Sequence, residues 1–137
     1  MSGEGAFLYG GRWNFPKTRM LYTASSGSLS LLEMLVHLPN YQIDTPFALI
    51  TIEIPDQNFP RLEIEKLPQG WNSFSSFEVS RMAGFEAFNK FKSLGLFVPS
   101  VVMSLDFNFL IDPLHPDFSK IKIVDQMEYT LEKRFRK

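Results

Sequence analysis

The stretch MLYTASSGSLSLLEMLVHL (20–38) sets the fold class, because its hydrophobic pattern changes in the middle. Its first five residues, MLYTA (20–24), predict a short strand. The turn-like segment SSGS follows, and its last residue, Ser28, is a favourable helix N-cap. Residues 29–38 then predict a helix that is apolar on nearly all sides and therefore largely buried, ended by Pro39 and Asn40.

The rest of the chain predicts further strands and one more helix. FALITIEI (47–54) is rich in β-branched residues and predicts a strand, and RLEIEKL (61–67) predicts a shorter one. A second helix is expected over about 78–92, with three phenylalanines at three-residue spacing on one face. Residues 1–19 predict an irregular segment. Three more extended segments are LFVPSVVM (96–103), DFNFLID (106–112) and KIKIVDQMEYTL (120–131). We therefore predict a single compact α+β domain over 1–137, with a mixed or antiparallel sheet and flanking helices.

The composition excludes several classes of protein. A formal net charge of −1 argues against a broad nucleic-acid surface, although a local phosphate site is allowed. The chain has no cysteine, which excludes disulfides, thiolate metal sites and cysteine nucleophiles. Two histidines, His37 and His115, do not make a zinc set. No signal peptide or membrane-spanning run is visible, so we expect a soluble cytoplasmic protein.

Two charged residues could carry chemistry. Arg12 follows two glycines in YGGRWN (9–14), and its planar guanidinium could hold phosphate oxygens, or it could be an ordinary surface arginine in a loop. Glu33 lies within the apolar helix, where a carboxylate needs a partner or a cavity. Alternatively, Ser30, Glu33 and His37 share one helix face and form its solvent-exposed stripe.

Three further polar residues lie in predicted strands. Tyr22 is in the first strand, where a tyrosine most often belongs to the core. Ser100 follows Pro99 in an apolar segment, so its hydroxyl needs a hydrogen-bond partner, and no base is visible that would make it a nucleophile. Asn108 lies between two phenylalanines and either faces solvent or fixes a loop.

Taken together, these residues follow an ordered pattern that resembles the RES domain family, the toxins of bacterial RES–Xre toxin–antitoxin pairs. The resemblance covers nearly the whole chain. No single motif is diagnostic, but five in the same order are specific. The matching stretches are GGRWN (10–14), LYTASS (21–26), LLEMLVHL (31–38), LFVPSVV (96–102) and NFLIDPLHPDF (108–118), and IKIVDQMEY (121–129) resembles the closing strand of the family.

The resemblance implies an ADP-ribosyltransferase-like fold and an enzyme that degrades NAD as its substrate, with no other cofactor and no metal. It implies that Arg12, Glu33 and Tyr22 are catalytic. It also implies that Arg12, Tyr22, Ser100 and Asn108 bind the substrate. Breaking the nicotinamide–ribose bond develops positive charge on the ribose, which a carboxylate such as Glu33 stabilises. Family members begin with a further arginine-bearing strand, which we expect to be missing here because only eleven residues precede Arg12.

Three functions stay open at this point. The first is NAD hydrolysis or phosphorolysis, kept silent by an Xre-like antitoxin bound to the chain. The second is transfer of ADP-ribose to a protein. The third is a shortened RES-like module that binds its antitoxin or a nucleotide without turnover. The resemblance allows a homodimer, and neither direct nucleic-acid binding nor membrane association is expected.

Overall fold

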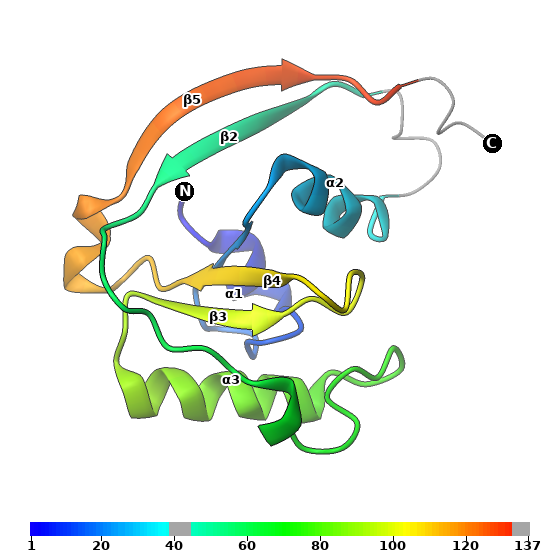
Figure 1. Ribbon diagram of the computed structural model, residues 1–137, viewed down its shortest axis with the longest axis vertical. Helices are drawn as coiled ribbons and strands as arrows, with labels where there is room; N and C mark the ends of the chain where they lie inside the picture. The colour runs from blue at the N-terminus through cyan, green and yellow to red at the C-terminus, as the bar shows by residue number, and fades with distance from the viewer. Residues whose placement is uncertain (39–44, 133–137) are drawn as a thin grey trace.

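The structure is a computed structural model that describes residues 1–38 and 45–132 (Figure 1). The first predicted helix, 29–38, already ends at Leu35. Its predicted stop at Pro39 and Asn40 lies outside the described residues. The α-helices are α1 (Glu4–Tyr9), α2 (Gly27–Leu35) and α3 (Glu78–Phe91). Two short 3-10 helices are η2 (Ile64–Lys66) and η3 (Pro116–Lys120). The strands are β1 (Leu21–Ala24), β2 (Phe47–Glu53), β3 (Gly95–Pro99), β4 (Phe107–Ile111) and β5 (Lys122–Tyr129).

The strands form two antiparallel sheets, which confirms the predicted α+β class. One sheet has three strands in the order β1-β4-β3, and the other is the two-stranded ribbon β2-β5. Since β1 and β3 both run antiparallel to β4, their C-terminal ends lie beside the N-terminal end of β4. Ala24 and Val98 are both paired with Asn108 in one cross-strand row. This strand order brings the end of β1, the end of β3 and the start of β4, which are distant in the sequence, to one end of the sheet.

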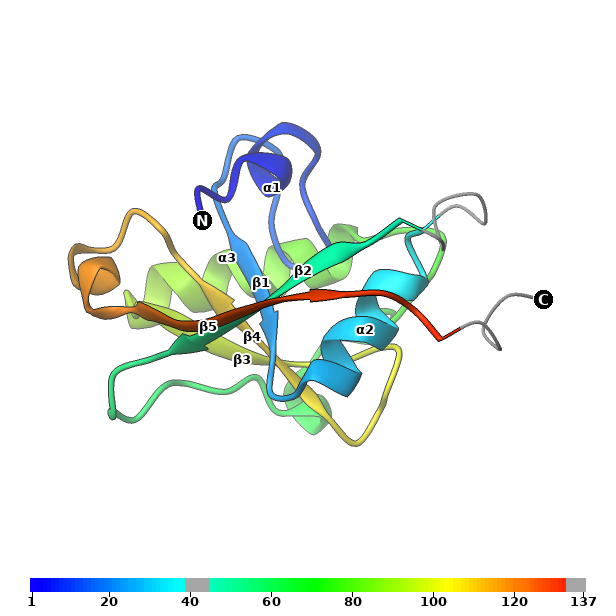
Figure 2. The same cartoon turned by 90° about the horizontal axis from the view of Figure 1, so that it is seen from above.

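The elements are arranged in layers around the three-stranded sheet. Helix α3 lies along one side of this sheet, while α2 and the β2-β5 ribbon lie on the other (Figures 1 and 2). One core cluster lies on the α3 side and includes Trp13, Leu96 and Leu110. A second cluster, around Phe109 and Ile111, is packed against Ile52 of β2 and Ile54 just after it. No helix within 1–38 and 45–132 is long and apolar enough to cross a membrane.

Several local predictions are wrong. Residues 4–9 form α1 instead of an irregular segment, and Ala6 from this helix packs on the core. RLEIEKL makes one bridge, between Arg61 and Phe97, and then turns into η2. Helix α2 begins earlier than predicted, because Ser26 and not Ser28 is its N-cap and accepts a hydrogen bond from the Leu29 amide.

The burial of α2 differs from the prediction, and α3 is buried through small residues. Only Leu29 of α2 is buried, so this helix is less buried than its apolar sequence predicts. In α3 the buried residues are Ser80, Gly84 and Ala87, while the phenylalanines lie half-buried or exposed. A Cβ added to Gly84 would lie 2.1 Å from the carbonyl oxygen of Trp13. Small residues on this face therefore let the backbone of residues 10–19, the arginine loop, approach the helix closely.

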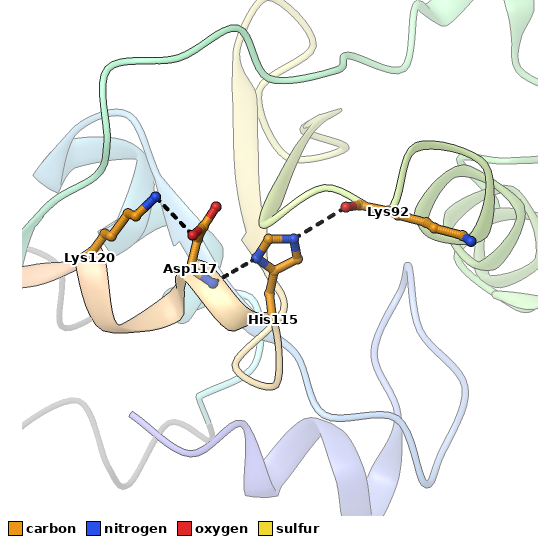
Figure 3. Close-up of polar contacts among 4 residues, drawn as sticks. All are labelled: Lys92, His115, Asp117 and Lys120. Carbon is orange, nitrogen blue, oxygen red and sulfur yellow. Dashed lines mark hydrogen bonds and ion pairs between the residues drawn. The ribbon is translucent and has the colours of Figure 1, made fainter.

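The C-terminal end of α3 is tied to the segment after β4 by His115 (Figure 3). Its Nε2 atom lies 3.2 Å from the carbonyl oxygen of Lys92, the left-handed C-cap residue of α3. Its Nδ1 atom accepts a hydrogen bond from the Asp117 amide at the start of η3. His115 therefore links the C-terminal end of α3 to the N-terminal end of η3.

Candidate functional site

A cleft of about 760 Å³ opens at the end of the three-stranded sheet where β1 and β3 end and β4 begins. Helix α2, which follows β1 after a two-residue turn, and the arginine loop both contribute to its walls. The polar and charged residues that line it are Tyr9, Arg12, Tyr22, Thr23, Ser30, Glu33, His37, Arg81 and Asn108. The shared face of Ser30, Glu33 and His37 that the sequence predicts therefore faces this cleft.

Glu33 is held by the ends of two strands. Its Oε1 atom accepts a hydrogen bond from the Ser100 hydroxyl at 2.7 Å and another from the Asn108 amide nitrogen at 2.5 Å. Within the described residues no donor binds its second oxygen, Oε2. The carboxylate is therefore fixed by one oxygen, while the residue lines the cleft. The sequence left open whether Glu33 is a partnered carboxylate beside a cavity or part of a solvent-exposed stripe. The structure agrees with the first interpretation.

Ser100 and Asn108 both donate to Glu33, but they differ in their position relative to the cleft. Ser100 is 1% exposed and lies beneath the cleft, and its hydroxyl also accepts hydrogen bonds from the Val102 and Met103 amides. Ser100 is thus in contact with the carboxylate of Glu33 and is not among the residues that line the cleft. Asn108 does line the cleft, and its buried Oδ1 atom has no hydrogen-bond partner in the described part of the chain.

Arg12 is anchored by the segment that precedes α3. Its Nη1 atom donates to the carbonyl oxygens of Trp71 and Ser73, at 3.2 and 3.0 Å, and its guanidinium carbon lies 4.4 Å from the Phe77 ring centroid. Burial lowers the pKa of the Arg12 guanidinium and the Glu33 charge raises it, but an arginine side chain keeps its charge in either case. In the chain as described, no carboxylate lies within 4.0 Å of it, so its charge is not neutralised by an ion pair.

Tyr22 connects the first strand to the arginine loop. Its hydroxyl accepts a hydrogen bond from the Trp13 amide at 3.0 Å and donates one to Asn14 Oδ1 at 2.7 Å. Although 41% of the residue is exposed, the hydroxyl itself is enclosed, and a Cβ on Gly11 would lie 2.3 Å from it. Burial of the hydroxyl raises the pKa of Tyr22 to about 12, so the phenol is neutral at ordinary pH.

One cleft residue that the sequence did not single out is Arg81. Its Nε atom donates to the Gly11 carbonyl oxygen at 2.8 Å, while the preceding residue, Ser80, donates to the Arg12 carbonyl oxygen at 2.7 Å. Helix α3 therefore holds the arginine loop by two consecutive side chains. An arginine on an amphipathic helix gives no signal of this in a single sequence, because a solvent-exposed position has the same pattern.

The arrangement suits one kind of ligand. Two guanidinium groups supply positive charge for an anion, and a carboxylate with one free oxygen lies in the same cleft. The exposed side of the Tyr22 ring offers a surface on which a flat ring can stack. Such a cleft can bind an anionic molecule and stabilise positive charge that develops on it near Glu33.

Comparison with known proteins gives consistent results. The sequence model described as "RES domain" matches residues 1–132. The chain is 37% identical to "Toxin Res" of Photorhabdus laumondii over 137 residues, which are 99% of this chain and 88% of that protein. It is 35% identical to "Toxin Res" of Yersinia enterocolitica, covering 98% of this chain and 90% of that protein. It is 37% identical to "Prs ADP-ribosylating toxin" of a Sphingobium species, covering 89% of this chain and 78% of that protein.

A solved structure has a similar fold. It is the M. tuberculosis MbcT–MbcA toxin–antitoxin complex, which is similar to this chain with a TM-score of 0.72. The match covers 95% of this chain and 77% of the matched chain, at 17% sequence identity. At that identity the similarity concerns the fold alone, and it agrees with the arrangement of strands described above.

Proposed function

The chain belongs to the RES domain family. We propose that it is the toxin of a bacterial toxin–antitoxin pair and that this toxin degrades NAD. In the proposed reaction the bond between C1′ of the ribose and the nicotinamide nitrogen breaks, and its electron pair leaves with neutral nicotinamide. The oxygen of water or phosphate then bonds to C1′, and its proton is released to the carboxylate or to solvent. The names of the relatives support a toxin, and one of them names ADP-ribosylation.

Glu33 carries the chemical step in this proposal. The ribose gains positive charge as nicotinamide leaves, and a carboxylate next to C1′ stabilises that charge. Because Ser100 and Asn108 both bind Oε1, the free Oε2 is the atom that would face C1′ or orient the nucleophile. The unpartnered Asn108 Oδ1 is an acceptor that a ligand hydroxyl or amide would satisfy.

Arg12 and Tyr22 position the substrate. Arg12 has no carboxylate partner in the described residues and would bind the diphosphate, which fixes the ribose relative to Glu33. The exposed ring surface of Tyr22 would stack on the nicotinamide, while its neutral hydroxyl holds the arginine loop through Trp13 and Asn14. The observation that carries the proposal is the fixed carboxylate in the same cleft as an arginine without an ion-pair partner.

The test is nicotinamide release from NAD by the purified chain, compared between matched variants. We expect Glu33→Gln and Arg12→Lys to lose most of the turnover, since the first removes the charge and the second removes the planar fork. Glu86→Gln and Arg61→Lys are the matched controls. Glu86 is exposed on α3, and Arg61 also stacks on a ring, that of Phe107 at 4.2 Å, but does not line the cleft. Equal turnover in all four variants and the wild type would refute the assignment.

A second candidate function is transfer of ADP-ribose to a protein, which the 37% identity to the Sphingobium ADP-ribosylating toxin favours. The same cleft would serve, with a protein side chain as the nucleophile. Labelled NAD distinguishes the two reactions, because label on an added protein indicates transfer and free ADP-ribose or its phosphate ester indicates degradation. NAD binding without release of nicotinamide would instead indicate a binding module.

We also propose that an Xre-type antitoxin silences the chain by covering this cleft. The support is the family itself and the fold similarity to a chain of a toxin–antitoxin complex. The expected result is that a purified antitoxin of that type suppresses nicotinamide release at a one-to-one ratio.

A further inference from the structure

A second hollow lies beside the cleft, and the proposed function does not use it. Its volume is about 500 Å³, within the range of ligand sites in proteins. It shares three lining residues with the cleft, Phe74, Phe77 and Arg81. The two hollows therefore adjoin at these three residues, and a ligand longer than the cleft can reach the second hollow across them.

The side chains of the second hollow differ from those of the cleft. Its lining residues are Phe15, Phe74, Ser75, Ser76, Phe77, Glu78 and Arg81. Phe74 is 86% exposed, so its ring is open to a ligand in this hollow. Its ring is free to stack on a flat base, and hydroxyl and carboxylate side chains next to it can bind the hydroxyls of a sugar. A carboxylate at this position argues against a phosphate in the hollow itself.

Arg81 stands where the two hollows meet. Its Nε atom donates a hydrogen bond to the Gly11 carbonyl oxygen. Among the residues described, no acceptor binds its Nη atoms, and no carboxylate lies within 4.0 Å of its guanidinium group. Arg81 and Arg12 both lie over the Phe77 ring, with guanidinium carbons 5.7 and 4.4 Å from its centroid. Two arginines over one ring, neither of them in an ion pair within the described residues, supply positive charge for two adjacent phosphates.

From this geometry we propose that the second hollow binds the nucleoside half of the dinucleotide, and that Arg81 is a second diphosphate-binding residue at the junction. This inference rests on the proposed function for the identity of the whole substrate. The nicotinamide end lies in the cleft by Glu33, the diphosphate crosses the Phe77 ring between Arg12 and Arg81, and the base stacks on Phe74. Glu78 binds the sugar hydroxyls, and its charge disfavours a 2′-phosphate there.

The test is calorimetric binding of ADP and of adenosine to the full chain, because neither probe can be cleaved at the nicotinamide bond. We expect Phe74→Ala to weaken both probes by roughly tenfold, since stacking on an aromatic ring contributes about that factor. Phe91→Ala is the matched control, because Phe91 is also exposed on its helix but lines neither hollow. Phe74 is so exposed that its truncation leaves the fold intact.

Arg81→Ala is expected to weaken ADP roughly tenfold and to leave adenosine unchanged. The adenosine affinity is then an internal check that the hollow is still folded, since this variant also loses the hydrogen bond to Gly11. Glu78→Gln is expected to weaken adenosine and to improve the binding of adenosine 2′,5′-bisphosphate, whereas Glu86→Gln does neither.

The outcomes separate this inference from the proposed function. Nicotinamide release from NAD, together with ADP binding that does not respond to Phe74→Ala or Arg81→Ala, would overturn the second hollow and leave the function standing. ADP binding that responds to both variants, without nicotinamide release, would support the hollow and overturn the function. Absence of ADP binding to the wild type would overturn the inference outright.

Discussion

Removing the Ser100 hydroxyl tests whether the chain positions Glu33 from beneath the cleft. Ser100→Ala deletes one of the two donors to Glu33 Oε1 without changing any surface that a substrate touches, because the residue is 1% exposed. A hydrogen bond to a charged group contributes about 1.5–3 kcal/mol. At roughly 1.4 kcal/mol per factor of ten, the expected loss in kcat is about tenfold to a hundredfold, with KM for NAD little changed.

The same substitution affects stability through the backbone. The hydroxyl accepts hydrogen bonds from the Val102 and Met103 amides, at 3.1 and 2.9 Å. Solvent reaches this loop, so we expect the free energy of unfolding to fall by about 1–2 kcal/mol and not by the full cost of two buried unpaired groups. Urea unfolding measures this change separately from the kinetics, and Ser104→Ala in the exposed part of the loop is the control.

A double-mutant cycle with Asn108→Ala makes the test sharper. Both donors bind the same carboxylate oxygen, so once one is lost the other no longer holds Glu33 in place. The losses in kcat should therefore not add, with a coupling of at least about 0.5 kcal/mol. Additive losses, or a Ser100→Ala variant as active as Ser104→Ala, would refute the idea that these residues act through Glu33.

Three further predictions concern the support of the site. Gly84→Ala should lower the free energy of unfolding by about 1–3 kcal/mol in urea, because its methyl group would meet a backbone carbonyl of the arginine loop, whereas Gly5→Ala, with open space around it, should raise it slightly. Ser26→Ala should cost about 1 kcal/mol of unfolding free energy and Ser28→Ala much less, since the first residue is the N-cap; the opposite order would contradict the cap assignment. The pKa of Tyr22 is raised from 10 to about 12. The free energy of unfolding should therefore fall as the pH rises from about 10 towards 12, and it should be unaffected by this group below pH 10. If the free energy of unfolding of the wild type and of Tyr22→Phe changed equally with pH, the hydroxyl would not be enclosed.

Much of the fold could be predicted from local pattern. The β-branched run at 47–54, the helix at 78–92 and the apolar segments after Gly95 all correspond to elements of the structure, because each has the periodicity of its own element. RLEIEKL was mispredicted for the same reason. Its alternation is that of a strand, but it makes one bridge to β3 before the chain turns away. Whether a neighbouring strand is available is a tertiary property.

The candidate site divides in the same way. The ordered motifs identified Arg12, Tyr22, Glu33, Ser100 and Asn108, and four of them line the cleft. A single sequence cannot indicate that Ser100 faces the carboxylate and not a ligand, because direction depends on how β3 and β4 end beside α2. Nor can it distinguish Arg81 from a basic helix residue such as Lys90, since the role of Arg81 depends on its contact with a loop seventy residues earlier.

The sequence by itself determined the class of fold, the family and the residue types available for binding an anion and stabilising positive charge. Only the tertiary structure decided which of these residues meet. The physical reason is that antiparallel pairing places the ends of β1 and β3 beside the start of β4, which collects residues 24, 98 and 108 in one row. The face of α3 that carries Ser80, Gly84 and Ala87 has small side chains, so the arginine loop packs closely against it. Arg12 and Arg81 both then lie over the Phe77 ring.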